Sequence, residues 1–255
     1  MYEPPSSPQS IGGVLDDGFK LYRASLSRVL PLAFLATLAG QLPSLMLPVG
    51  TLPNLGIAYL ATLLVSMIMS MVFFGAVIGR MHAAAANRVM SLQDALGLAV
   101  RRLVPLAAGA LLYTLILIAG LLLLLVPGII LGLSLMFSVY VVLLEGEGPL
   151  AGLKTSHQLV WGNWWRTFVI VSVAMLVLMA AYMLVGFAVG FAVAFGGGTE
   201  PGSGLMRFLE LVLLPVFGAV LTPLIYALIL ATYYDLKLRR SGADLEQRLA
   251  ATAHA

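Results

Sequence analysis

Four side chains in this sequence could converge to do chemistry: Glu145, Glu147, His157 and Asp235. A histidine among carboxylates can hold a metal ion or transfer protons. Their spacing, however, matches no metal-binding pattern such as H-E-x-x-H, and no G-x-S-x-G, Walker A or G-x-G-x-x-G turn occurs in the sequence. We favour a plainer interpretation, in which Glu145 and Asp235 end helices at a membrane interface and His157 borders the apolar face of its helix. The sequence therefore predicts a protein that is not an enzyme and has no catalytic residue, metal site or cofactor.

The composition is that of a membrane protein. Of its 255 residues 61% are hydrophobic and 10% are charged, whereas soluble domains contain about 25% charged residues. A soluble fold with so little charge could not cover its own surface, but a fold surrounded by lipid could. Because the sequence has no cysteine, disulfides and thiolate chemistry are excluded. The net charge of +3 does not indicate a nucleic-acid partner, because the charges lie at the ends of apolar segments.

Six apolar segments are long enough to cross a bilayer, whose core needs about 20 helical residues. We expect an all-α polytopic membrane protein with six transmembrane helices at 29–48, 55–79, 103–126, 128–145, 167–194 and 206–233. The third and fourth spans follow each other closely, and we expect Pro127-Gly128 to break the helix between them. The sequence thus predicts one membrane domain over residues 11–240, a disordered tail at 1–10 and a cytoplasmic tail at 241–255.

The positive charges predict the orientation of these spans. Thirteen of the fourteen Lys and Arg residues fall on one side of the six spans, and only Arg207 falls on the other. Cytoplasmic loops carry such an excess, so we expect both termini in the cytoplasm and the protein in a bacterial inner (cytoplasmic) membrane. The three tryptophans, Trp161, Trp164 and Trp165, lie on the same inner side, where aromatic side chains mark the membrane interface.

Charged residues within the spans are scarce. Glu210 is the one candidate, and its i,i+3 spacing from Arg207 favours an ion pair at the outer interface. Because ionisable groups inside the membrane mark ion and proton pathways, their scarcity argues against a proton pump or an ion-coupled carrier.

Short amphipathic segments precede the hairpins on the cytoplasmic side. Ser91 and Asp94 predict a capping box at the start of one such helix, and Pro149 opens another. Basic residues beside these segments could hold anionic lipid headgroups. We expect such contacts at Arg23, Arg101, Arg102, Lys154 and Arg166.

Three G-x-x-x-G pairs let helix backbones approach closely and predict tight packing or a homo-oligomer. These pairs are Gly75–Gly79, Gly128–Gly132 and Gly186–Gly190.

The chain resembles a known bacterial family in four passages, which are IGGVLDDGFKLYRASLSRVLPLA, PGIILGLSLMFSVYVVLLEGEGPLAGLKTSHQLVWGNWWRTF, the final span and YYDLKLRRSGADLE. They are similar to the six-helix membrane domain attached to some glycerophosphodiester phosphodiesterases and to the stand-alone YciC-like inner-membrane proteins. In the fused phosphodiesterases the catalytic barrel is a separate domain, so the resemblance implies no phosphodiesterase activity here. It implies a membrane protein connected with lipids or the cell envelope.

Our leading functional hypothesis is a non-enzymatic inner-membrane protein that binds or handles lipids or organises the envelope. Its expected partners are membrane lipids and a second copy of the chain, and not nucleic acid. Two alternatives stay open. One is a passive channel or transporter for a small or amphipathic solute, and the other is a membrane scaffold for a protein partner.

Overall fold

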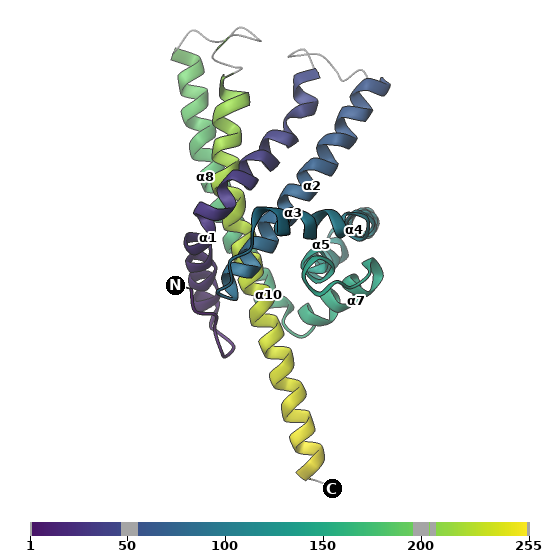
Figure 1. The fold of residues 1–255 in the computed structure, drawn as a ribbon. Coiled ribbons are helices and arrows are strands. Elements are labelled where there is room, and N and C mark those ends of the chain that lie inside the picture. Colours follow the sequence, from purple (N-terminus) through teal and green to yellow (C-terminus); the bar gives the residue numbers. More distant parts are fainter. Residues whose placement is uncertain (1, 47–55, 196–203, 205–207, 254–255) are drawn as a thin grey trace.

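The computed structural model describes residues 2–46, 56–195, 204 and 208–253, and all regular structure among them is helical. Four long helices run beside one another (Figure 1). They are α1 (Ile11–Gly40), α2 (Ile57–Ala85), α8 (Trp164–Phe195) and α10 (Leu214–Ala253). A short 3-10 helix, η1 (Leu42–Met46), follows α1, and a π-helical turn, η3 (Leu209–Leu213), precedes α10.

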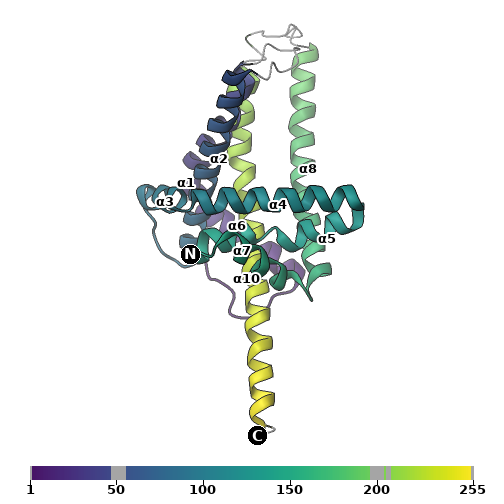
Figure 2. The same cartoon turned by 90° about the vertical axis from the view of Figure 1, so that its right-hand side faces the viewer.

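A second group of shorter helices connects α2 to α8. It comprises α3 (Leu92–Arg101), α4 (Leu103–Leu123), α5 (Leu125–Leu135), α6 (Ser138–Tyr140), the π-helical turn η2 (Val141–Glu145) and α7 (Pro149–Val160). Figure 2 shows α4 running across the long helices instead of alongside them, with α5 and α7 beside it. The main partners of α4 are α5 and α7. The fold is therefore a long-helix bundle with a crosswise helical layer on one side.

The bundle is centred on α1, which packs on α2 and α10 along most of its length. Its buried face near the apolar end carries Ala33, Ala36 and Ala39, whose small side chains let the neighbouring helices come close. Two hydroxyl groups stabilise these contacts. Ser66 Oγ on α2 donates to the Ala39 carbonyl oxygen on α1 at 2.7 Å, and Thr37 Oγ1 on α1 donates to the Pro215 carbonyl oxygen on α10 at 3.0 Å. Such hydrogen bonds join helices where apolar contact gives no preference over lipid.

Five helical segments among the described residues are long and apolar enough to cross a membrane. They are Ile57–Ala85, Leu103–Leu123, Leu125–Glu145, Trp164–Phe195 and Leu211–Gly242. The chain is thus a polytopic membrane protein. The first predicted span, 29–48, begins inside α1, which ends at Gly40, and its last two residues lie outside the described part of the chain. The count of six spans stays a prediction.

The break between α4 and α5 lies three residues before the predicted Pro127-Gly128. Leu124 adopts an extended conformation (φ −161°, ψ 141°), so α4 ends at Leu123 and not at 126. Pro127 is then the third residue of α5. Proline is accommodated there because the first N–H groups of a helix have no partner within the helix.

Two of the three glycine pairs lie at helix contacts. A Cβ atom on Gly75 would come within 3.1 Å of Ala99 Cβ on α3, and one on Gly128 would come within 2.5 Å of Leu121 Cδ2 on α4. A Cβ atom on Gly79 or Gly132 would likewise meet Leu98 or Leu117. The third pair is open, since nothing lies within 4 Å of a Cβ atom on Gly186 or Gly190.

The amphipathic segments form helices with the expected starts. The Ser91 hydroxyl caps α3 by accepting from the Asp94 N–H at 3.0 Å and donates to the Asp94 carboxylate at 2.6 Å. Pro149 is the first residue of α7, where proline needs no N–H. The amphipathic segment that precedes the first apolar span, residues 11–26, is continuous with the apolar part of α1 and does not form a separate surface helix.

The structure differs from the predicted N-terminal and C-terminal tails. The tail predicted to be disordered has defined contacts, because Tyr2 is buried and the Gln9 backbone is hydrogen-bonded to α10. At the other end, α10 extends as a helix to Ala253, beyond the predicted domain limit at 240.

Candidate functional site

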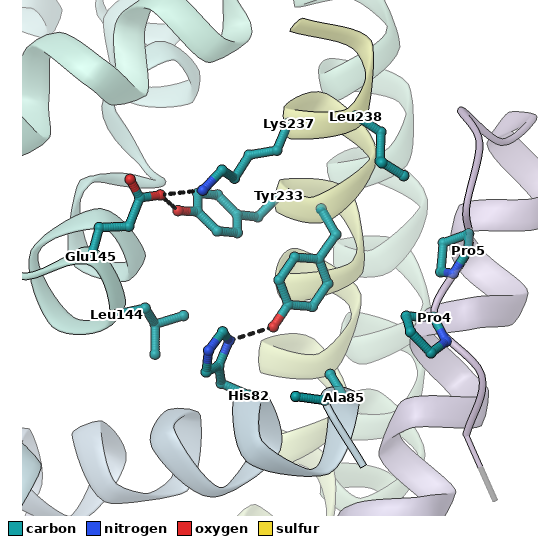
Figure 3. A pocket seen from close by; sticks show the side chains of 11 residues that line it. Pro4, Pro5, His82, Ala85, Leu144, Glu145, Tyr233, Lys237 and Leu238 are labelled. Atoms are coloured by element: carbon teal, nitrogen blue, oxygen red, sulfur yellow. Dashed lines mark hydrogen bonds and ion pairs between the residues drawn. The ribbon is translucent and has the colours of Figure 1, made fainter. Parts of the chain in front are cut away.

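A pocket of about 510 Å³ opens where α2, η2, α10 and the N-terminal segment meet. Most of its wall is apolar, and Pro4, Pro5, Ala85, Leu144 and Leu238 contribute to it (Figure 3). The polar side chains come from α10, which supplies Tyr233, Tyr234 and Lys237, from the end of α2, which supplies His82, and from η2, which supplies Glu145. The site therefore joins parts of the chain that are far apart in sequence.

The first polar group in the pocket is built around the Glu145 carboxylate. Lys237 Nζ lies 2.9 Å from Glu145 Oε1, and the Tyr233 hydroxyl donates to the same oxygen. Lys237 Nζ also lies 5.5 Å from the centroid of the Tyr233 ring. Gly146, with φ of 77°, ends the π-helical turn directly after Glu145, in a conformation that favours glycine. This turn and the i,i+4 spacing of Tyr233 and Lys237 bring the three side chains together (Figure 3).

The second polar group is a histidine–tyrosine pair. His82 Nδ1 lies 2.6 Å from the Tyr234 hydroxyl. His82 lies in the last turn of α2 and Tyr234 in the middle of α10, and their rings are 6.1 Å apart. Both side chains line the pocket as one hydrogen-bonded unit, and Figure 3 shows His82 beside Ala85.

Behind the pocket, Asp235 holds the N-terminal segment in place. Its carboxylate is buried and accepts three hydrogen bonds: from Gln9 N at 2.8 Å, from Arg166 Nε at 3.0 Å and from Arg239 Nε at 2.9 Å. Both guanidinium groups also donate to the Gln9 carbonyl oxygen. We call this set of four residues the Asp235 clamp. It fixes residue 9, and thereby the segment whose Pro4 and Pro5 form one wall of the pocket.

The four residues that the sequence offered for chemistry do not converge. His157 packs against the Trp161 ring at 5.0 Å between centroids, and Glu147 accepts from Thr155 Oγ1 at 2.9 Å. Glu145 and Asp235 both contact α10 residues but through separate networks. In the described part of the chain, no group of three or more His, Asp or Glu side chains could hold a metal ion.

The predicted lipid-contacting residues fall into two groups. Arg23, Arg101 and Lys154 are exposed, so contact with headgroups stays a prediction for them. Arg102 Nη1 instead donates to the Gly146 carbonyl oxygen at 2.9 Å, and Arg166 belongs to the Asp235 clamp.

The predicted outer ion pair cannot be placed. Arg207 lies outside the described residues, and so does the side chain of Glu210.

Sequence reasoning missed His82 and the pairing of Glu145 with Tyr233. A histidine at the end of an apolar span, two residues after Arg80, is a weak signal, and nothing near it in the sequence points to Tyr234. The i,i+4 spacing of Asp235 and Arg239 on one helix was a usable signal for half of the clamp. Arg166 and Gln9 reach Asp235 only through the tertiary fold.

Comparison with known proteins assigns the chain to a family. The model of a domain of unknown function, DUF7847, matches residues 55–236. Over 107 residues the chain is 39% identical to the UPF0259 membrane protein plu2479 of Photorhabdus laumondii, an alignment that covers 42% of this chain and 41% of that protein. The chain thus spans less than half the length of this relative. No solved structure shows significant similarity to it.

These matches support the assignment of this chain to a family of bacterial membrane proteins, and the apolar helices described above agree with that assignment. Neither match names an enzymatic activity. Because the family match covers most of the sequence, including α2, α4, α5, α7, α8 and α10 as far as Leu236, this chain is an integral membrane protein that belongs to the DUF7847 family.

Proposed function

We propose that this protein binds an amphipathic membrane molecule, a phospholipid, in the pocket between α2, η2, α10 and the N-terminal segment. The observation that carries the proposal is the pairing of an apolar wall with the polar group of Glu145, Tyr233 and Lys237. Ligand pockets of this size usually combine an apolar lining with a few fixed polar groups that orient the ligand. The apolar wall suits an acyl chain, and the polar group suits a headgroup.

The charges of the pocket favour a headgroup that carries both signs. Lys237 is a three-donor ammonium group, one of whose donors is engaged by Glu145, and its side chain is 48% exposed. It therefore has donors to offer to a phosphate oxygen. Glu145 has a second carboxylate oxygen that can accept from a headgroup amine. Because the two residues neutralise each other, the pocket has no strong preference for a headgroup of high net charge.

The pocket lies where the predicted orientation puts the cytoplasmic interface. Lys237, Arg239 and Arg240 follow the last apolar segment, and the N-terminal segment lies at the same end of the bundle (Figure 1). By the excess of Lys and Arg on this side we assign the protein to the inner membrane with both termini in the cytoplasm. A lipid in this pocket would come from the cytoplasmic leaflet, and its binding requires no catalysis.

Native mass spectrometry of the protein released from nanodiscs of mixed phospholipids tests this proposal. We expect the wild type to retain one lipid in fixed stoichiometry and Leu238→Trp, which places an indole in the pocket, to lose it. Leu150→Trp on the exposed face of α7 is the matched control and should retain the lipid. Equal lipid retention in all three proteins would refute the pocket as the binding site.

Lys237→Gln adds a test of the headgroup contact. We expect it to keep a lipid but to lose the preference among headgroups, because the apolar wall is intact. Lys20→Gln removes an exposed lysine charge that is likewise paired with a carboxylate, Asp16, but lies outside the pocket and outside the predicted headgroup contacts, and it should leave that preference unchanged.

A further inference from the structure

We infer that the α4–α5 hairpin does not cross the bilayer but lies within one leaflet, with its turn among the acyl chains on the side where the hairpin begins and ends. The chain then crosses the membrane four times, through α1, α2, α8 and α10. This inference concerns a lipid-facing surface and is independent of the pocket proposed above.

The first observation is the direction of the hairpin. If α2, α8 and α10 cross the bilayer, a helix that crosses with them must run alongside them. Figure 2 shows α4 running across that bundle, and Figure 1, turned by 90°, shows α4 and α5 nearly end-on beside the long helices. The closest packing of α4 is with α5 and α7, and not with the long helices.

The second observation is the position of the hairpin turn relative to α8. Ile130 lies six residues after the break at Leu124 and lines one pocket of about 490 Å³ together with Trp161, Gly162, Asn163 and Arg166. These residues lie at or just before the start of α8, at the end of the bundle that bears the tryptophans. If α4 and α5 crossed the bilayer, Ile130 would lie only about 9 Å from a turn at the opposite interface, and thus about 20 Å away from these residues.

The third observation is the chemistry of the turn. From Leu121 to Val126 every side chain is an exposed Leu or Val, and Leu122 is 81% exposed. Turns at a membrane–water interface carry polar or aromatic anchors, and this turn has none. A turn inside the hydrocarbon must limit its unpaired backbone groups. Leu124 N donates to the Gly120 carbonyl oxygen at 3.0 Å, Gly128 N donates to that of Leu124 at 3.2 Å, and Pro127 has no N–H to satisfy.

The outer face of α4 fits the same environment. Its exposed stripe consists of Val104, Leu111, Leu115, Ile118 and Leu122. At the base of the hairpin, Arg102 donates to the Gly146 carbonyl oxygen and joins the residue before α4 to the residue after η2. The hairpin therefore has an apolar outer surface and an arginine at its open end. This arrangement fits a hairpin that lies parallel to the membrane, just below the headgroups of one leaflet.

The distribution of positive charge cannot distinguish this arrangement from two spans. A hairpin that crosses and returns brings the chain back to the side where it began, as an in-plane hairpin also does. From Leu103 to Leu144 the sequence has no charged residue that would reveal the position of the turn. The two arrangements therefore predict the same orientation for every other helix.

Double-cysteine crosslinking in membranes tests the inference, and the absence of native cysteine makes every introduced thiol unique. We expect Ile130→Cys with Asn163→Cys to crosslink with a short bismaleimide, because both residues line one pocket. We expect Ile130→Cys with Gly204→Cys to remain uncrosslinked, because Gly204 follows the end of α8 at Phe195, and α8 runs about 48 Å from Trp164 to Phe195. The reverse pattern, or no crosslink in the first pair, would overturn the inference.

Labelling of single introduced cysteines from outside the cell gives a second test, which remains available if a double-cysteine variant does not fold. A membrane-impermeant maleimide should label Gly204→Cys in intact spheroplasts but leave Leu124→Cys unlabelled. Labelling of Leu124→Cys at the rate of Gly204→Cys would place the turn on the outer side and contradict the in-plane hairpin. Size-exclusion profiles that match the wild type verify that the variants are folded.

Discussion

Removing the Asp235 carboxylate should destabilise the protein far more than removing an exposed carboxylate does. Asp235 is 1% exposed and accepts from Gln9 N, Arg166 Nε and Arg239 Nε at 2.8 to 3.0 Å. In Asp235→Ala the two guanidinium groups lose their counter-charge while they stay largely buried. Breaking a buried ion pair from one side costs about 3–5 kcal/mol.

The geometry of the clamp places the expected cost near the lower end of that range. The side chains of Arg166 and Arg239 are 17% and 28% exposed, so water can solvate them in part once the carboxylate is gone. Both also keep their hydrogen bonds to the Gln9 carbonyl oxygen. We therefore expect a loss of about 3 kcal/mol for Asp235→Ala. Asp235→Asn keeps an acceptor for Gln9 N but loses the charge, and it should cost about 2 kcal/mol.

The matched control is Asp16, which pairs with Lys20 at 2.6 Å on the exposed face of α1. Both side chains of that pair are 60% exposed, and an exposed i,i+4 pair contributes about 0.3–0.5 kcal/mol. The assay is reversible unfolding in mixed micelles with increasing SDS, followed by tryptophan fluorescence. If Asp235→Ala and Asp16→Ala unfold within about 0.5 kcal/mol of each other, the clamp does not stabilise the fold and the reasoning from burial fails.

The remaining predictions concern the hairpin, its link to α7 and the N-terminal segment. Gly128→Ala should cost about 1–3 kcal/mol, because its Cβ would lie 2.5 Å from Leu121 Cδ2, whereas Gly186→Ala should be neutral or slightly stabilising in the same unfolding assay. Ser156→Ala should cost about 1–3 kcal/mol, because the buried hydroxyl accepts from Phe137 N and donates to the Ser134 carbonyl oxygen; an unchanged unfolding midpoint would contradict this. Burial, with the nearby Asp17 carboxylate adding to it, raises the pKa of Tyr2 from 10.0 to about 12. The Tyr2 contribution to holding the N-terminal segment is therefore complete below pH 10 and is lost as the pH rises towards 12. A spin label at Ser7→Cys should become mobile over that range, and Tyr2→Phe should abolish the transition; a transition that persists in Tyr2→Phe would refute it.

The sequence was a good guide to helices and a poor guide to how they cross. α2, α4 and α8 lie close to the spans predicted at 55–79, 103–126 and 167–194, and the Ser91–Asp94 cap is confirmed. In contrast, α1 begins 18 residues before the predicted first span and α10 ends 20 residues after the predicted last one. The break near Pro127 was predicted three residues late, because proline fits the first turn of a helix as readily as it ends one. Periodicity and length describe a helix by itself, and they carry no information on its direction relative to the bundle.

The candidate site could be predicted only in part. Glu145 and Asp235 were both expected to end helices, but only Glu145 does, since α10 continues past Asp235 to Ala253. Their partners lie up to 226 residues away along the chain. His82 meets Tyr234 across 152 residues, and no local pattern encodes that contact. The pocket follows from the packing of α2, η2 and α10 with the N-terminal segment. The sequence predicted most of the helices that form the pocket, but it did not predict that they pack together there.

The measurement that tests the central claim most directly is photocrosslinking with a phospholipid that carries a photoreactive group on its acyl chain, followed by peptide mapping. Lipid bound in the pocket should label wild-type peptides that contain His82 to Ala86, Leu144 or Leu238, and Leu238→Trp should lose that labelling. Labelling of the exposed stripe of α4 is expected in both proteins, because that stripe faces bulk lipid, and it serves as the internal standard. Labelling confined to the stripe in the wild type, with none in the pocket peptides, would contradict a lipid-binding function for this site.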